Sequence, residues 1–225
     1  MVKEDLIEIN RLMLLSLSNL LCANSNISGL SPRLIFPVLN NRLRISEQEA
    51  RLIYCNILNN TNYFYSIETP TILKYQFSGI SKSTASSDLS IYSYDSKFCK
   101  VVNVEFKSHN VEYKNIAKDI EKLLKEKMLG NWFHILENCD NGTIHSLFAK
   151  FKESLLKHID DFTETVSILF TFYSYKNRWG CYKYFTFDTN TDKKQYIEKF
   201  FQIGYKVQHS KISVTENNEW NIVNI

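Results

Sequence analysis

The chain has 225 residues, of which 44% are hydrophobic and 23% charged, and its formal net charge at pH 7 is +3. That length and apolar content suffice for one folded domain, so we expect residues 1–225 to form a single domain. The composition excludes a disordered or polybasic protein, and any nucleic-acid surface must therefore come from local clusters of cations. The five cysteines are scattered without a CxxC pair, which argues against a disulfide framework or a zinc site and predicts a reducing, cytoplasmic compartment.

The N-terminal segment contains the apolar run LMLLSLSNLLCA, which superficially resembles the core of a signal peptide. The preceding residues include Glu4, Asp5 and Glu8, whereas a secretory signal begins with a basic segment. The run is also too short and too often interrupted by Ser and Asn to cross a membrane. We therefore expect a soluble helix over residues 4–22 that buries one wide face, and no membrane association.

A second helix is predicted to start at Ser46, where SEQE reads as a capping box between Ser46 and Glu49. It should end near Asn59. Three strands are predicted next, because aromatic, β-branched and alternating residues dominate 62–77, 87–93 and 100–108.

The remaining elements are predicted from the same periodicities. They are a helix at 115–128, a short strand at 132–136, a helix at 143–159, strands at 167–175 and 182–187, a helix at 192–204 and a final hairpin over 211–225. This order predicts an α/β (α+β) fold with a central mixed sheet flanked by helices, preceded by an N-terminal helix and extended at the C-terminus by strand and helix.

The stretch VVNVEFKS, residues 101–108, is an apolar strand that ends in an acid and a base. Side chains alternate between the two faces of a strand, so Phe106 joins the apolar core face. Asn103, Glu105 and Lys107 then share the opposite face. We expect Glu105 and Lys107 to project together from the strand.

Asp88 starts the strand expected just upstream, on the polar face of SDLSIYS. If these two strands pair antiparallel through the turn at Asp95, the start of one lies beside the end of the other. Asp88 is therefore expected next to Glu105 and Lys107. Two carboxylates and an amine in one patch can bind Mg²⁺ and act on a phosphate, and burial of the lysine would lower its pKa.

SSDLSIYS followed by VVNVEFKS resembles the PD-(D/E)XK phosphodiesterase superfamily, which has the restriction-endonuclease-like fold. The similarity covers about residues 46–136 and includes the order helix, three strands, helix, strand. It implies that Asp88 and Glu105 are metal ligands and that Lys107 is the catalytic lysine, with Mg²⁺ as the cofactor and Mn²⁺ as a substitute. Ser87 stands where the family's motif has Pro.

An acid from the upstream helix often completes the site in that family. Glu49 is the metal ligand expected here, although the capping box explains this residue equally well. Glu47 and Glu68 are the alternatives. The other (D/E)xK triplets begin at Asp95, Glu112 and Asp192, and none of them ends a continuous apolar strand.

Other cations could contact a nucleic acid. Lys118 and Lys122 are expected on the polar face of the helix at 115–128, where solvated charges are common. The segment YSYKNRWGCYKY places Lys176 and Arg178 among tyrosines that could stack on bases. The competing interpretation, which we favour, is a hairpin whose aromatic residues pair across strands.

The function expected from the sequence is a Mg²⁺-dependent endonuclease that hydrolyses phosphodiester bonds, with DNA rather than RNA as the main substrate and a role in restriction, defence or repair. It could act as a homodimer or as a subunit of a larger system. The alternative is a catalytically inactive module of the same fold that binds nucleic acid or protein.

Overall fold

The structure is a computed structural model that describes residues 1, 3–22, 32–77, 81–161, 165–187, 192–201, 205–208, 211–214 and 220–224. Its helices and strands follow one another along the chain as α1 (Lys3–Cys22), β1 (Val38–Leu39), β2 (Arg42–Leu43), α2 (Glu47–Leu58), β3 (Phe64–Tyr75), β4 (Ser83–Asp95), β5 (Lys97–Ser108), α3 (Tyr113–Lys125), β6 (Leu129–Leu136), α4 (Asn141–Lys157), a 3₁₀ turn (Ile159–Asp161), β7 (Val166–Ser174), β8 (Trp179–Phe187), α5 (Lys193–Phe200), β9 (Tyr205–Gln208), β10 (Lys211–Val214) and β11 (Asn221–Asn224).

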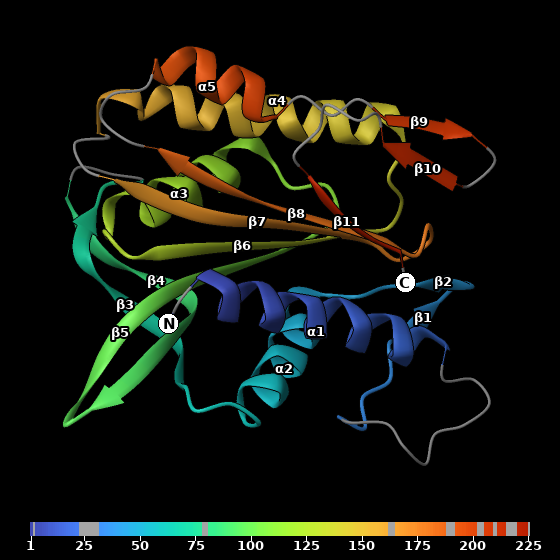
Figure 1. The fold of residues 1–225 in the computed structure, drawn as a ribbon, viewed down its shortest axis with the longest axis horizontal. Coiled ribbons are helices and arrows are strands. Elements are labelled where there is room, and N and C mark those ends of the chain that lie inside the picture. The colour runs from blue at the N-terminus through green and yellow to red at the C-terminus, as the bar shows by residue number, and fades with distance from the viewer. Residues whose placement is uncertain are drawn as a thin grey trace.

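A seven-stranded mixed sheet in the order β11-β8-β7-β6-β5-β4-β3 forms the centre of the molecule (Figure 1). β3, β4 and β5 are a meander of antiparallel strands, whereas β5, β6 and β7 are parallel and are connected through α3 and α4. The predicted α/β class with helices on both faces of a mixed sheet is confirmed.

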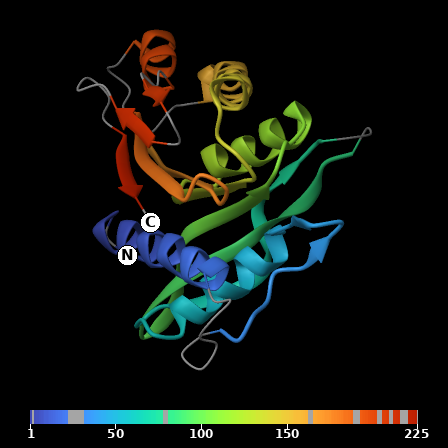
Figure 2. The same ribbon diagram turned by 90° about the vertical axis from the view of Figure 1, so that its right-hand side faces the viewer.

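Each face of the sheet has its own hydrophobic core. α3, α4 and α5 cover one face, and α1 and α2 cover the other (Figures 1 and 2). The first core is rich in aromatic side chains, including Trp132 and Phe151, whose rings meet edge to face with centroids 5.0 Å apart. The second core contains the apolar stripe of α1 and the even-numbered apolar residues of β5, including Phe106. No helix of the described residues is long and apolar enough to span a lipid bilayer.

Two sequence predictions about the strands were wrong. β4 begins at Ser83 rather than at Asp88, because Ser83 already pairs with Tyr75 of β3. The C-terminal segment is not one hairpin, because β10 pairs with β9 whereas β11 adds to the large sheet beside β8. The sequence also did not reveal the short β1–β2 hairpin, whose strands have only two residues each.

Candidate active site

The meander places the three residues of the sequence motif together. β4 and β5 are antiparallel with Leu89 opposite Val104, so Asp88 lies beside Glu105. The Asp88 Oδ2 atom accepts a hydrogen bond from the Phe106 N–H at 2.8 Å and lies 3.6 Å from the Lys107 Nζ atom. The predicted proximity of Asp88 to the end of β5 is confirmed.

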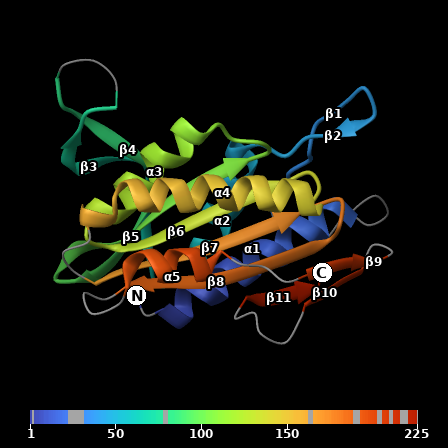
Figure 3. The same ribbon diagram turned by 90° about the horizontal axis from the view of Figure 1, so that it is seen from above.

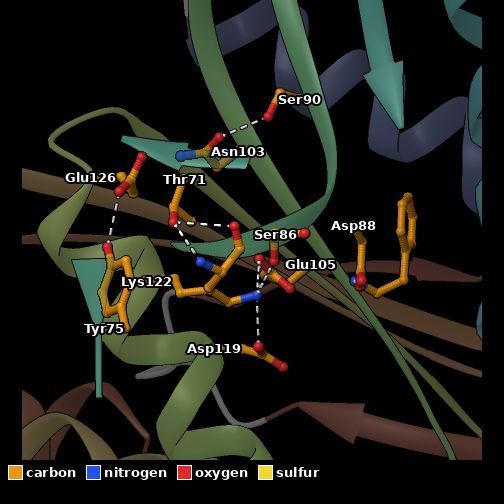
Figure 4. Close-up of polar contacts among 12 residues, drawn as sticks. Thr71, Tyr75, Ser86, Asp88, Ser90, Asn103, Glu105, Asp119, Lys122 and Glu126 are labelled. Atoms are coloured by element: carbon orange, nitrogen blue, oxygen red, sulfur yellow. Dashed lines mark hydrogen bonds and ion pairs between the residues drawn. The ribbon is translucent and has the colours of Figure 1, made fainter. Parts of the chain in front are cut away.

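Helix α3 adds two further charged residues to this group. The Lys107 Nζ atom lies 2.9 Å from Asp119 Oδ2, and the Lys122 Nζ atom lies 2.8 Å from Asp119 Oδ1 and 2.7 Å from Glu105 Oε1. Figure 4 shows Lys122 extending from α3 toward Asp119 and Glu105. Acids and lysines therefore alternate in one chain of contacts, which we call the charged cluster: Asp88, Lys107, Asp119, Lys122 and Glu105.

The charged cluster is largely buried, and Asp88 is its most exposed member. Glu105 has no exposed surface, and Lys107 and Lys122 retain 8% and 3%. The physical reason is that α3 packs across this face of the sheet, and its residues Asp119 and Lys122 replace water as partners of the strand charges. The expectation that Lys122 lies on a solvated helix face was wrong.

Glu105 is the least satisfied member of the cluster. Its Oε1 atom lies 2.7 Å from the Lys122 ammonium group, whereas its Oε2 atom has no hydrogen-bond partner among the described residues. Burial raises the pKa of Glu105 to about 8, which outweighs the opposing effect of Lys122. A buried carboxylate with an open oxygen is an energetically costly arrangement unless a cation or proton completes it.

The two lysines remain cationic. Burial acts to lower the pKa of Lys107, but the carboxylates of Asp119 and Asp88 outweigh it and raise this pKa above the ordinary value. The pKa of Lys122 is likewise raised, because Glu105 and Asp119 outweigh burial. Burial acts on the pKa of Lys107 in the expected direction, but the net pKa is raised rather than lowered, because two partners of Lys107 are acids.

The three upstream acids occupy different positions. Glu49 is committed to the predicted capping box, where its Oε2 atom accepts hydrogen bonds from the Ser46 N–H and hydroxyl. Glu47 instead points to the charged cluster, accepting a hydrogen bond from the Ser108 N–H at 3.3 Å. Burial raises the pKa of Glu47, with Asp88 adding to the effect and Lys107 opposing it. Glu47 thus takes the place that the sequence prediction assigned to Glu49.

Arg51 joins the third upstream acid to the cluster. Its guanidinium lies 2.7 Å from Glu68 Oε1 and 3.5 Å from Asp88 Oδ1. Glu68 has a φ angle of 51°, in the left-handed region that non-glycine residues seldom adopt. Such backbone strain persists where the surrounding structure imposes it, and it often occurs near functional sites.

A cleft opens over the charged cluster. Its volume is about 400 Å³, and its walls include Asp88, Lys107, Asp119 and Lys122 together with Glu47. Residues Glu68 and Ser86 line it from the meander, and Asn115 and Lys118 line it from α3. The lining is mostly polar and charged, which suits a polar ligand rather than an apolar one.

A divalent cation fits one part of this site. Mg²⁺ takes carboxylate oxygens and keeps several waters, so one or two protein carboxylates suffice to bind it. Asp88 and the open oxygen of Glu105 supply such a pair. Within the described residues, however, no three His, Cys, Asp or Glu side chains converge into a complete metal-binding group, and the Lys122 ammonium is the positive charge nearest Glu105.

Of the other predicted nucleic-acid contacts, one lies at the cleft and two lie elsewhere. Lys118 is exposed at the rim of the cleft, with its Nζ atom 4.9 Å from the Phe77 ring centroid. Lys176 and Arg178 lie in the turn between β7 and β8, and Lys176 forms a 2.5 Å ion pair with Glu137. The predicted hairpin is confirmed, because β7 and β8 pair antiparallel, but the predicted aromatic pairing is wrong: Tyr173 lies opposite Gly180 and Tyr182 lies opposite Thr171.

Sequence reasoning missed the contribution of α3. Asp119 lies three residues after Ile116 and four before Leu123, which places it on the apolar stripe of the helix. A charged residue at such a position signals a buried partner. The partner itself, Lys107, is a strand residue that the sequence alone does not connect to the helix.

Comparison with known proteins adds no family to this description. No protein-family model, curated protein or solved structure matches the chain.

Proposed function

We propose that the protein is a metal-dependent nuclease whose active site is the cleft over the charged cluster. The observation that supports this most is the buried carboxylate of Glu105, which has an open oxygen beside Asp88 and Lys107. A purely structural carboxylate is normally saturated by donors. The resemblance of the strand pair to the PD-(D/E)XK phosphodiesterases supports the same reaction.

In this proposal Asp88 and Glu105 hold Mg²⁺ or Mn²⁺, with Glu47 close enough to the cleft to orient bound water. When bound, the metal would polarise a phosphate oxygen and lower the pKa of a coordinated water. Water attacks the phosphorus atom, the bond from phosphorus to the 3′ oxygen breaks, and that oxygen leaves with a proton. The products are a 5′-phosphate and a 3′-hydroxyl.

Lys107 acts as a cation in this reaction. Asp119 and Asp88 keep it protonated, so it does not serve as the general base. Its ammonium group instead stabilises the negative charge that develops on the phosphate and holds the attacking water in line. Asp119, 2.9 Å from the ammonium, positions Lys107 for that task.

The alternative function is a catalytically inactive module of the same fold that binds nucleic acid. The observation that favours it is the ion pair between Lys122 and Glu105, in which an ammonium group already provides the charge that a metal would bring. In this alternative the cluster is an internal salt-bridge network and the cleft only accommodates a phosphate.

A cleavage assay with matched variants separates the two functions. Wild-type protein is incubated with plasmid DNA, single-stranded DNA and RNA in Mg²⁺, Mn²⁺ or EDTA. The nuclease proposal expects cleavage only with metal, with DNA as the best substrate, and its loss in Asp88→Asn and Glu105→Gln. Glu198→Gln is the control, because the Glu198 carboxylate pairs with Lys152 at 3.2 Å and neither residue lines the cleft.

Calorimetric titration with Mn²⁺ provides a readout independent of cleavage. We expect binding by wild type and by Glu198→Gln, and no binding by Glu105→Gln. Absence of Mn²⁺ binding and of cleavage in the wild type would refute the nuclease proposal and leave the binding module. Cleavage that persists in Asp88→Asn would show that the reaction takes place elsewhere.

A further inference from the structure

Two β-hairpins project from the same side of the molecule. One is the β1–β2 hairpin, and the other is the outer half of the β3–β4 hairpin (Figure 2). Viewed from above, they stand apart, with α3 and α2 between them (Figure 3). We call them the first arm, residues 33–44, and the second arm, residues 71–77 and 81–85.

Both arms carry positive charge and no acidic residue. The first arm contains Arg33, Arg42 and Arg44, and the second contains Lys74 and Lys82. The whole chain has a net charge of only +3, so these five cations exceed it and the remainder of the chain is net negative. Positive charge is therefore concentrated on the two projections.

The arm cations are also free to bind. All five side chains are exposed, and none of them forms an ion pair within the described parts of the chain. Arg51, Lys107 and Lys122 of the cleft, by contrast, are each held by carboxylates. An exposed and unpaired guanidinium or ammonium group is the usual partner of a nucleic-acid phosphate.

Exposed apolar side chains accompany these cations. Ile35 and Val38 of the first arm are 85% and 64% exposed, and Ile72 of the second arm is 65% exposed. Aliphatic residues on projecting strands can contact sugars and base edges in a groove, next to the phosphates that the cations bind. Solvent exposure of such residues on thin hairpins has no benefit for the folded core.

The arms are attached to the walls of the cleft. The first arm ends at Arg44, three residues before Glu47, and the Tyr175 hydroxyl donates a 3.0 Å hydrogen bond to the Leu43 carbonyl at its base. Burial and the nearby Arg44 charge lower the pKa of His109, which locates Arg44 close to the end of β5.

The second arm continues directly from Glu68 and Ser86, which line the cleft. The buried Glu126 carboxylate holds its base through the Ile72 and Leu73 N–H groups at 2.9 and 3.0 Å. Figure 4 shows Glu126 beside Tyr75 of this arm. Each arm is therefore fixed to one side of the cleft.

We propose that the two arms form a clamp that holds a double-stranded nucleic acid across the cleft by its phosphate backbones. This inference rests on the proposed nuclease function, because that function requires a phosphodiester group of the duplex to reach Asp88 and Glu105. The position of the duplex across the cleft follows from this requirement. The cleft lining has four carboxylates against three lysines, so without a metal it offers a phosphate no net attraction, and the arms supply the attraction that brings the substrate there. Two separated basic projections match the two backbones of a duplex, whereas a single strand offers only one.

The test measures binding in EDTA, where no cleavage can occur. Fluorescence anisotropy is recorded for duplex DNA, duplex RNA and single-stranded DNA at several salt concentrations. The variants are Arg42→Ser/Arg44→Ser for the first arm and Lys74→Ser/Lys82→Ser for the second. Lys194→Ser/Lys199→Ser is the matched control, because it removes two exposed lysines from α5 on the opposite side of the sheet from α2.

We expect each arm variant to weaken duplex binding by about tenfold at moderate salt and to reduce the slope of log K against log salt by about two. The control should bind like the wild type. Duplex binding by either arm variant equal to that of the wild type would overturn the clamp, as would a single strand that binds as tightly as the duplex. If the arm substitutions weaken binding to duplex DNA more than binding to duplex RNA, duplex DNA is the substrate that the arms prefer.

Failure of the clamp and failure of the nuclease proposal are distinguishable. Wild type that binds duplex through the arms but does not cleave it with Mg²⁺ or Mn²⁺ supports the clamp and refutes the nuclease. Wild type that cleaves with metal while both arm variants bind and cleave normally supports the nuclease and refutes the clamp. Circular dichroism of each variant checks that the arms' substitutions leave the fold intact.

Discussion

Two groups of buried polar side chains lie on opposite faces of the same sheet. On the face covered by α1 and α2, Asn10, Tyr54, Asn131 and Thr171 form a neutral network. Asn10 Nδ2 donates to Asn131 Oδ1 and to Thr171 Oγ1 at 2.8 Å, and Asn131 Nδ2 donates to the Tyr54 hydroxyl at 2.9 Å. On the face covered by α3 lies the charged cluster, in which the Oε2 atom of Glu105 has no hydrogen-bond partner among the described residues.

The difference separates a structural role from a functional one. The neutral network is saturated, lies away from the cleft and joins α1 and α2 to β6 and β7, so it specifies how the helices dock. Four members of the charged cluster line the cleft, and the fifth, Glu105, is fully buried. Buried ion pairs often stabilise less than apolar residues of the same volume, which favours a functional reason for keeping them.

The largest expected effect is on catalysis, from Lys107→Met. Removing the ammonium group should lower the single-turnover cleavage rate by about 10³-fold, because charge stabilisation and water positioning are lost together. The control is Lys152→Met on α4, where the lysine pairs with Glu198 at 3.2 Å outside the cleft. A rate for Lys107→Met within a few-fold of wild type would assign the cluster to structure alone.

The neutral network should respond in the opposite way. Asn131→Ala leaves Asn10 and Tyr54 with unsatisfied buried groups, and we expect a loss of about 2–4 kcal/mol in the free energy of unfolding. The folded fraction should cleave at the wild-type rate. The exposed Asn138→Ala provides the comparison and should change stability by less than about 0.5 kcal/mol. Urea denaturation measures the free energy of unfolding of both variants. A cleavage defect in folded Asn131→Ala would contradict a purely structural role for the neutral network.

A third prediction concerns pH. The folded pKa of Glu105, about 8, lies above the ordinary value of 4.5, so the folded state binds this proton more tightly than the unfolded state. In EDTA the stabilising contribution is therefore present at low pH and is lost as the pH rises from about 5 through 8. The melting temperature of wild type should therefore fall over this pH range, by about 2–4 °C for each kcal/mol of stability that is lost.

The matched variant for this measurement is Glu105→Gln, which has no proton to lose and should lack that part of the decline. Mn²⁺ added at pH 8.5 should raise the melting temperature of wild type and leave that of the variant unchanged, because a cation then stabilises the ionised carboxylate. Parallel pH profiles of the two proteins would show that Glu105 does not titrate in the folded state.

The smallest effect is expected from Lys176→Ala. Its ammonium group is paired with Glu137 and is exposed, so the charge available to a phosphate is already offset. We expect less than about a twofold change in duplex affinity, compared with about tenfold for the arm variants. A larger loss, measured by the same anisotropy titration, would extend the basic surface from the first arm to the β7–β8 turn.

The sequence predicted the site up to the strand pair and no further. Alternation along β5 and the Asp-led strand upstream were sufficient to bring Asp88 to Glu105 and Lys107, because neighbouring antiparallel strands with a short turn have few possible registers. The capping box of Ser46 and Glu49 was predicted for the same reason, since its contacts span three residues. Glu47, in contrast, accepts a hydrogen bond from Ser108, which is 61 residues away in the chain. Local sequence patterns cannot predict a contact over that separation.

By itself, the sequence determined the principal helices and strands, the antiparallel meander and the two faces of β5. These follow from periodicities of 3.6 and 2 residues, which depend on near neighbours in the chain. The tertiary structure alone decided which charges are buried. The packing of α3 over β5 places Asp119 and Lys122 against Lys107 and Glu105. Burial and charge pairing then set the protonation of the site, because both depend on contacts between residues that are distant in sequence.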